Sequence, residues 1–283
     1  MDYPFWVNDF DRVRDHKQNF PLASKIFEYP TAFWYGERNG KEMKDLDKSL
    51  KRLFKRTSPQ LPVLVCYNLP NRDIGQYSKG GAKTKESYLN FIESFATGIG
   101  ELSPIVIFEP DALPHLGEME KQDREYRLEL MKEGLEIFTR LSKAHVYIDI
   151  GHSNWLSPLE ASSLIGSVTN EYVRGFAVNV SNYRTSKESL NWSLKVCEYS
   201  KDLHFVIDTS RNGNGPHGND WCNPPGRSLG TPPTCDTGHE KCDAFLWVKV
   251  PGESDGKSNG GPRAGRFWGE MADELVKNTI WIS

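Results

Sequence analysis

Short apolar runs alternate with helical patterns along most of the chain. The runs are rich in Val, Ile and aromatic residues, as strands buried on both faces are. They fall at about residues 31–35, 63–69, 105–109, 145–150, 175–180, 204–208 and 245–250. Apolar residues at helical spacing are Met43, Leu46, Leu50 and Leu53, then Tyr88, Phe91, Ile92 and Phe95, then Leu128, Met131, Leu135 and Phe138, and finally Phe267, Met271, Leu275 and Val276. The pattern therefore predicts seven strands in alternation with helices.

Strands that alternate with helices predict an α/β fold with a parallel sheet, which either closes into a barrel or stays open. The order of elements alone does not decide between the two. An open dinucleotide-binding sheet would have a glycine-rich turn after its first strand, and residues 36–39 (GERN) lack one. We therefore favour a seven-stranded β/α barrel, and the 283 residues suit one domain, residues 1–283. Thr185 with Glu188 predicts a capping box that opens one helix.

Composition and charge exclude several functions. The net charge is −3, and the one basic run, at residues 51–56, is interpreted as the wet face of a helix, so we expect no nucleic-acid partner. No apolar run is long enough to span a membrane, and the amino terminus lacks the features of a signal peptide. The irregular stretch 210–243 exceeds ordinary loop lengths, so we expect it to be functional or clamped.

Polar and aromatic residues stand where the predicted strands end, the edge at which parallel α/β folds build their sites. They include Trp34, Tyr67, Arg72, Asp73, Asp111, Asp149, His152, Trp155, Asn182, Asp208, Arg211, Trp247, Lys249, Glu253 and Asp255. Crowded carboxylates repel, so one of them has a raised pKa and can act as a general acid. Flat aromatic faces suit sugar rings. This combination predicts cleavage of a glycosidic bond.

A metal-dependent hydrolase and a binding protein without activity are the alternatives to this function. A metal-dependent hydrolase could use Asp149 with His152, or His239 with Glu240, but neither pair has further ligands at usable spacing, so we expect no metal and no cofactor. A catalytically inactive glucan-binding protein would keep the tryptophans but lose a carboxylate.

Seven segments carry a resemblance to a known family. They are YNLPNRDIG (67–75), FEPD (108–111), DIGHSNW (149–155), NVSNY (179–183), IDTSRNGNG (207–215), NDWC (219–222) and FLWVKVPGESDG (245–256). Together they resemble glycoside hydrolase family six, the family of cellobiohydrolase II and endoglucanases, from about residue 30 to the end. The resemblance implies a distorted seven-stranded barrel and the hydrolysis of β-1,4-glucan with inversion.

The resemblance also implies roles for the site residues. Asp111 would be the general acid, Asp73 would keep its pKa high and help to align the water, and Asp255 matches the disputed base. Arg72 and Lys249 would balance this negative charge. Tyr67 would press on the ring at the cleavage point, and the residues that match stacking platforms are Trp34, Trp155 and Trp247. Contacts to sugar hydroxyls are matched by His152, Asn182, Lys249 and Glu253. The residues that would hold the site together are Asp149, Asp208 and Arg211. The serine that orients the water aligns with either Ser78 or Lys79.

The cysteines depart from the family pattern. Ile74 and Lys257 stand where the family often has Cys, so its usual disulfides cannot form. Any bridge is expected to join Cys222 to Cys235 or Cys242, and a bridge in this loop would fit an exported protein. Cys66 and Cys197 are expected to be buried thiols.

The lengths of two loops bear on how the enzyme cuts. Processive members of the family have long insertions after the general-acid strand and after the last Asp-Gly, whereas here residues 112–121 and 257–265 are short. We therefore expect an open cleft and an endoglucanase, with a processive cellobiohydrolase as the alternative. We expect a secreted monomer whose partner is β-1,4-glucan.

Overall fold

The computed structural model describes residues 3–8, 19–36 and 45–282. Its sheet has seven parallel strands, in the order in which they occur in the chain. They are β1 (Phe33–Tyr35), β2 (Leu64–Cys66), β3 (Ile105–Phe108), β4 (His145–Asp149), β5 (Gly175–Val178), β6 (His204–Asp208) and β7 (Cys242–Leu246). The sheet curls, but its two edge strands form no ladder with each other. Hydrogen bonds from Ala32 N–H to the carbonyl of Trp247, at 3.0 Å, and from Trp34 Nε1 to the carbonyl of Val248, at 2.8 Å, join the segments at this seam. The barrel is therefore distorted, as the family resemblance implied.

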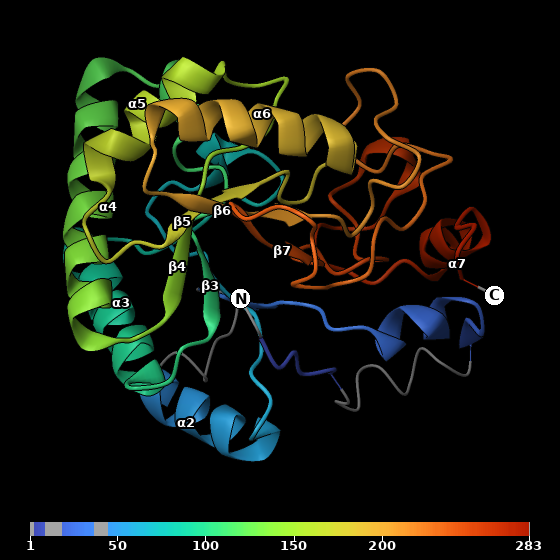
Figure 1. Ribbon diagram of the computed structural model, residues 1–283, viewed down its shortest axis with the longest axis horizontal. Coiled ribbons are helices and arrows are strands. Elements are labelled where there is room, and N and C mark those ends of the chain that lie inside the picture. Colours follow the sequence, from blue (N-terminus) through green and yellow to red (C-terminus); the bar gives the residue numbers. More distant parts are fainter. Residues whose placement is uncertain (1–2, 9–18, 37–44, 283) are drawn as a thin grey trace.

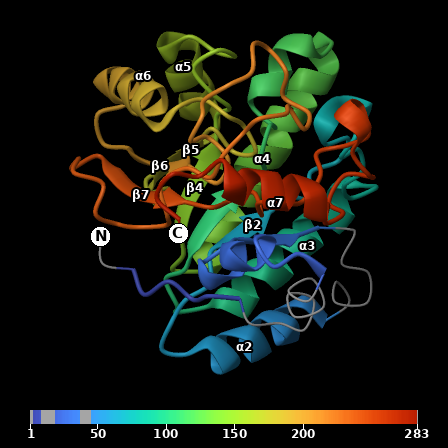
Figure 2. The ribbon, with the colours of Figure 1, turned by 90° about the vertical axis from the view of Figure 1, so that its right-hand side faces the viewer.

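The longer helices are α2 (Leu46–Thr57), α3 (Lys85–Ile99), α4 (Lys121–Leu141), α5 (Pro158–Val168), α6 (Ser186–Tyr199) and α7 (Gly269–Lys277), of which α2 to α6 cover the outer face of the sheet. Short 3-10 helices are η1 (Ala23–Glu28), η3 (Asp73–Gly75), η4 (Pro114–Glu118) and η5 (Ser258–Gly260). Helices α2 to α6 follow one another in an arc around the strands, whereas α7, η1 and long loops lie on the other side (Figures 1 and 2).

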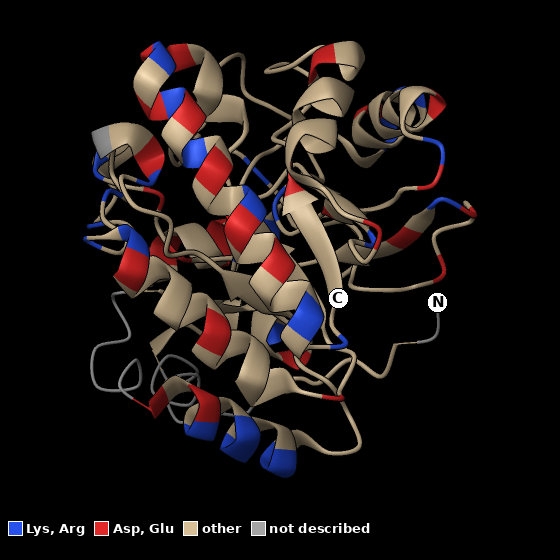
Figure 3. Ribbon diagram, turned by 90° about the vertical axis from the view of Figure 1, so that its left-hand side faces the viewer, with Lys and Arg blue, Asp and Glu red and all other residues tan. Residues whose placement is uncertain are grey.

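The alternation of side chains along each strand separates two apolar layers. Leu64 and Cys66 of β2 point toward the helices, whereas Val65 points into the barrel. Charged residues lie on the outward faces of the helices (Figure 3), and the basic run at 51–56 on α2 has its Lys and Arg side chains in solvent, as predicted. Among the described helices, none is both long and apolar enough to cross a membrane.

The last strand begins earlier than the predicted 245–250, because β6 pairs with residues from Cys242 onward. After Leu246 the backbone leaves the ladder. The N–H groups of Val248 and Lys249 instead donate to the carboxylate of Asp208, at 3.3 and 2.9 Å. A side chain thus replaces a neighbouring strand as the acceptor, which the apolar pattern could not show.

The helices differ in two places from those that the sequence predicted. Helix α5 has no counterpart among the predicted helices, although Ser157 and Glu160 form a complete capping box at its start. At α6, Thr185 caps the N–H of Glu188, but the Glu188 carboxylate binds Ser153 Oγ instead of closing the box. Met43, expected on α2, lies outside the described residues.

The five cysteines, all within the described residues, are free thiols, so this structure has no bridge from Cys222 to Cys235 or Cys242, and Cys66 and Cys197 are buried thiols as expected. Cys222 lies beside Ser258 and Asp255, near the carboxyl ends of the strands. Cys242 instead opens β7 at its amino end, and Cys235 lies near Tyr3, whose hydroxyl contacts the start of β3. A shared loop in the sequence therefore does not bring these thiols together.

An ionic cluster around the buried Asp243 connects the amino ends of strands β4 to β7. Asp243 of β7 accepts hydrogen bonds from Arg174 Nε at 2.8 Å and from the Tyr147 hydroxyl at 2.6 Å, and His204 Nδ1 lies 3.1 Å away. Burial raises the pKa of Asp243, but the hydrogen bonds from Arg174 and Tyr147 outweigh it and leave the pKa below its usual value.

Replacing Asp243 should reveal this cluster in the pH dependence of stability. Because the folded-state pKa is depressed, the carboxylate stabilises the fold above the unfolded pKa of about 4, and this contribution is lost as the pH falls through the folded value. We expect Asp243→Asn to lower the free energy of unfolding by about 2–3 kcal/mol at pH 7, and by much less near pH 2.5. Urea unfolding at both pH values measures this. The exposed Asp202→Asn is the control, and an equal loss at both pH values would contradict the role of the charge.

Candidate active site

A cleft of about 220 Å³ opens at the carboxyl ends of the strands. Its lining comes from β1 and from the segments that follow β1, β2, β3, β5, β6 and β7. The lining residues are Trp34, Tyr35, Gly36, Tyr67, Arg72, Asp73, Tyr77, Ser78, Asp111, Ser181, Trp221, Lys249, Glu253, Asp255 and Gly265. The three carboxylates singled out in the sequence, Asp73, Asp111 and Asp255, therefore line one cleft.

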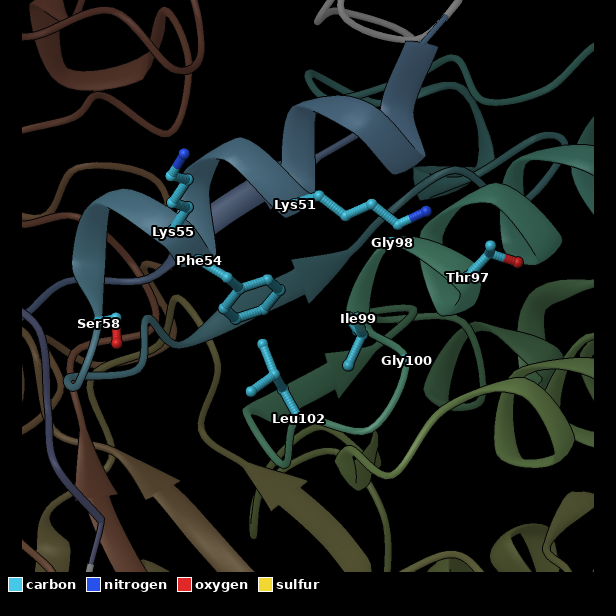
Figure 4. A pocket seen from close by; sticks show the side chains of 9 residues that line it. All are labelled: Lys51, Phe54, Lys55, Ser58, Thr97, Gly98, Ile99, Gly100 and Leu102. Carbon is cyan, nitrogen blue, oxygen red and sulfur yellow. The ribbon is translucent and has the colours of Figure 1, made fainter.

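A larger hollow of about 450 Å³ lies between α2 and the carboxyl end of α3 (Figure 4). Its lining includes Lys51, Lys55, Phe54 and Leu102, and no carboxylate. Without a carboxyl group, this groove lacks the acid that cleavage of a glycosidic bond needs, so the smaller cleft is the candidate site.

The Asp111 carboxyl group is set up to keep its proton. The residue follows β3 in a left-handed conformation (φ 66°), and its N–H donates to Asp149 Oδ2 at 2.7 Å. Burial raises the pKa of Asp111 to about 6; the charge of His115 opposes this shift, whereas Asp73 and Asp255 add to it. A carboxylic acid with this pKa donates protons near neutral pH.

Asp73 lies on the neighbouring turn, also in a left-handed conformation (φ 58°). Its Oδ2 accepts a hydrogen bond from the N–H of Ser78, and its Oδ1 lies 3.8 Å from His115 Nε2. Ser78 lines the cleft, whereas Lys79 is not among the lining residues. Burial lowers the pKa of His115, but the neighbouring carboxylates, Asp73 and Asp111 among them, raise it by more than burial lowers it. The pKa of His115 therefore lies above its usual value.

Asp255 has the opposite electrostatic setting. Its Oδ2 accepts hydrogen bonds from Arg211 Nη1 at 2.8 Å, from the Tyr183 hydroxyl at 3.1 Å and from Asn223 N–H at 3.1 Å. Lys249 Nζ lies 3.4 Å from Oδ1. Burial raises the pKa of Asp255, but Arg211 and Lys249 lower it more, so this carboxylate stays ionised.

Two further carboxylates lie beneath the cleft. Asp208 accepts four backbone hydrogen bonds, from Ser181, Ser210, Val248 and Lys249, and so ties together the loops after β5, β6 and β7. Asp149 supports Asp111 through Oδ2, while its buried Oδ1 has no hydrogen-bond partner in the described part of the chain. Burial holds the pKa of Asp149 well above its usual value.

The aromatic lining differs from the sequence expectation. Trp34 meets Tyr67 edge to face at 5.3 Å, and the Arg72 guanidinium covers the Tyr67 ring at 4.4 Å, so these two rings are held at the cleft. Trp247 does not fit the predicted role of a platform, because it is 1% exposed. Leu246 and Val248 point into the barrel, so alternation directs Trp247 to the other face, where α7 and η1 cover it.

Trp221 takes a place at the cleft that the sequence analysis had not assigned. It is 43% exposed, lines the cleft and lies 5.9 Å from the Tyr77 ring. It belongs to the long loop between β6 and β7, inside the quoted segment NDWC. A tryptophan in a loop rich in Gly, Pro and Asn was the signal that could have identified it.

Three predicted substrate contacts lie outside the residues that line the cleft. Trp155 is half-buried and packs edge to face on His115 at 4.8 Å, so it lies beside the carboxylates. His152 neighbours Trp155, and burial together with Arg184 lowers its pKa to about 4. The side-chain oxygen of Asn182 accepts a hydrogen bond from Tyr183 N–H. Their sugar contacts remain predictions.

Tyr77 crosses the cleft from the loop after β2. Its hydroxyl lies 3.0 Å from Ser258 Oγ, in the loop after β7, at an exposed contact. Its ring also lies against Gly256 of that loop. The side chain of Tyr77 therefore joins the two sides of the cleft.

No group of three or more His, Cys, Asp or Glu side chains is placed to hold a metal ion in the described ranges. The chemistry available from the residues at the cleft is that of a protonated acid, a fixed carboxylate and aromatic rings.

Comparison with known proteins identifies the family of this chain. The model of the glycosyl hydrolases family 6 matches residues 7–279. Endoglucanase A of Cellulomonas fimi is 41% identical over 92% of this chain and 57% of its own length, and endoglucanase 1 of Streptomyces sp. (strain KSM-9) is 38% identical over 86% and 68%. The structure of the endoglucanase Cel6 from Mycobacterium tuberculosis, in complex with methyl-cellobiosyl-4-deoxy-4-thio-β-D-cellobioside, superposes with a TM-score of 0.91 at 34% identity, over 98% of this chain and 97% of that one. The chain belongs to glycoside hydrolase family 6.

Proposed function

We propose that this protein is an endo-β-1,4-glucanase that cuts internal bonds with inversion at the anomeric carbon. The observation that carries the proposal is the contrast between the carboxyl groups of Asp111 and Asp255, one with a raised pKa and one held ionised, in a cleft lined by Trp34 and Trp221. The similar proteins named endoglucanases, and the cellobiosyl ligand bound to one of them, support β-1,4-glucan as the substrate.

In this mechanism Asp111 protonates the oxygen of the departing sugar. Its raised pKa keeps the proton available, and the negative charge of Asp73 contributes to that pKa. As the bond breaks, positive charge develops on the sugar ring, and the ionised carboxylates favour it. Tyr67, packed beneath Arg72, would press on the ring at the cleavage point.

The water needs a proton acceptor on the other side of the sugar. Asp255 is a weak acceptor, because Arg211 and Lys249 already compensate its charge. We therefore propose that Asp255 acts chiefly as a fixed negative charge. Asp73, with Ser78 at its side in the cleft, is placed to orient the water, and the proton that the water releases would pass to the Asp73 carboxylate. Ser78 is favoured over Lys79 as the serine of this site.

Substrate contacts follow from what lines the cleft. Trp34 and Trp221 would stack on sugar rings, and Lys249 and Glu253 would bind hydroxyl groups. Contacts from His152, Trp155 and Asn182 would lie further along the glucan. Asp149, Asp208 and Arg211 hold the loops that carry these side chains.

Internal cutting is favoured by the shortness of the segments 112–121 and 257–265. Such short segments cannot reach over a polysaccharide and return. The contact between Tyr77 and Ser258 is one exposed hydrogen bond, which a glucan chain can displace. Because cellulose is an insoluble polymer that cannot enter a cell, we propose that the enzyme is secreted, and that it acts as a monomer.

Asp111→Asn should abolish hydrolysis while leaving oligosaccharide binding intact, because the amide fills the same space but cannot deliver a proton. General acids contribute about 10²–10⁴-fold, so less than about 1% of the activity on cellohexaose should remain. In the unmodified enzyme the rate should fall as the pH rises through about 6, where Asp111 loses its proton. Rate measurements across pH and calorimetric binding test both statements, and a variant that stays active would exclude Asp111 as the acid.

Random internal cutting should lower the viscosity of carboxymethylcellulose quickly for each reducing end released. Proton NMR of the first products from cellohexaose should show the α-anomer, because the water attacks opposite the departing oxygen. A slow loss of viscosity with cellobiose as almost the only early product would support the cellobiohydrolase alternative. An initial β-anomer would contradict inversion.

The two tryptophans should respond differently to removal. Trp221→Ala should weaken binding of cello-oligosaccharides about tenfold, and should change the free energy of unfolding by less than about 0.5 kcal/mol, because the side chain is exposed. Trp247→Ala should cost about 3–5 kcal/mol of stability, because it leaves a cavity under α7. Calorimetry and urea unfolding compare them, and a stability loss confined to Trp221→Ala would reverse the assignment.

A further inference from the structure

A buried arginine joins the two turns that carry Asp73 and Asp111. Arg127, on α4, is 2% exposed. Its Nη2 donates to the carbonyl of Asn71 at 2.7 Å, and its Nη1 donates to the carbonyl of Ala112 at 3.3 Å. Asn71 lies two residues before Asp73, and Ala112 directly follows Asp111. One planar guanidinium group therefore spans both turns from below.

Both turns contain strained backbone that needs such support. Asn71, Asp73 and Asp111 all have positive φ, at 53°, 58° and 66°. For residues other than glycine these left-handed conformations are unfavourable, although less so for Asn and Asp, and they persist where surrounding contacts hold them. The carboxyl groups of Asp73 and Asp111 project from this strained backbone, so their separation depends on what holds the turns.

Other contacts also hold these turns. Glu109 lies on the second turn, two residues before Asp111, and its carboxylate accepts hydrogen bonds from the N–H groups of Asn68 and Leu69, so it joins the starts of the two turns. Asp149 accepts the N–H of Asp111. Arg127 differs from both, because it reaches the two turns from α4 and binds a backbone carbonyl of each beyond their starts.

We propose that Arg127 is a positioning residue that sets the distance between the Asp73 and Asp111 carboxyl groups, and so keeps Asp111 able to donate its proton. The proposal rests on the proposed function. Asp73 raises the pKa of Asp111 through its charge, and this effect weakens with distance. If the turns move apart, the pKa of Asp111 falls, and less of the acid is protonated near pH 6.

The direct effect of the arginine's charge has the opposite sign. The groups that interact most with the charge of Arg127 are Glu109, Tyr67 and Asp123. Removing a positive charge near Asp111 would raise the pKa of the acid, whereas loss of spacing from Asp73 lowers it. The direction in which the pH profile moves therefore separates the two effects.

The test uses Arg127→Gln and Arg127→Lys with two substrates. On cellohexaose, which needs the acid, we expect Arg127→Gln to reduce kcat about 30- to 100-fold with KM changed less than about twofold, since a shift of about 1 Å can cost 10²-fold. On 2,4-dinitrophenyl β-cellotrioside, whose leaving group needs no proton, the loss should stay below about threefold. The basic limb of the pH profile should move to lower pH.

Arg127→Lys keeps the charge but can bind only one carbonyl at a time. It should also lose more kcat on cellohexaose than on the dinitrophenyl substrate, but the loss should be smaller than that of Arg127→Gln. It also provides the test if Arg127→Gln does not fold. The matched control is Arg174→Gln, which removes a structural arginine at the other end of the strands and should affect both substrates equally. Thermal unfolding of all variants identifies losses that come from instability.

Equal losses on both substrates, or a basic limb that stays in place or moves to higher pH, would overturn the proposal. Asp111→Asn separates this failure from failure of the proposed function. If Asp111→Asn spares the dinitrophenyl substrate and abolishes cleavage of cellohexaose, Asp111 is the acid whatever Arg127 does. If unmodified enzyme leaves cellohexaose intact, the proposed function itself is wrong.

Discussion

The site depends on how negative charge is compensated where the parallel strands end. Because every strand ends at the same edge, the carboxyl groups of several acids are forced into one small volume, most of it away from water. Asp255 meets Arg211 and Lys249, and Asp208 meets four backbone N–H groups. Asp111 receives no comparable set of donors, and its pKa rises to about 6. This unequal compensation creates an acid and a fixed carboxylate from identical side chains.

Backbone strain is the second feature that the chemistry requires. Turning Asp73 and Asp111 toward the cleft needs left-handed conformations that apolar packing alone would not hold. Buried polar groups from other elements supply the restraint: Glu109 and Asp149 from the strand ends, and Arg127 from α4. The helices outside the barrel therefore bear on the geometry of the reaction, although none of them lines the cleft.

The strand count, the parallel order and the three carboxylates of the cleft followed from the sequence. Strands that alternate with helices leave few topologies, and the short apolar runs identify six of the seven strands at nearly their observed positions. The seventh strand was predicted too late in the chain, because the charged residue Asp243 interrupts its apolar pattern. Arg174, directly before β5, pairs with Asp243. No local pattern announces a buried charge whose partner is 69 residues away.

The sequence by itself determined which residues reach the edge of the sheet, because the carboxyl ends of all parallel strands lie at the same edge. Only the tertiary structure decided what each of them meets there. Trp247 is buried because α7 and η1 fold over it, whereas Trp221 is exposed because its loop returns to the cleft. Cys222 and Cys242 share a loop but lie at opposite ends of the barrel. Burial, pairing and pKa depend on neighbours that are distant in the chain, and these neighbours exist only once the barrel has formed.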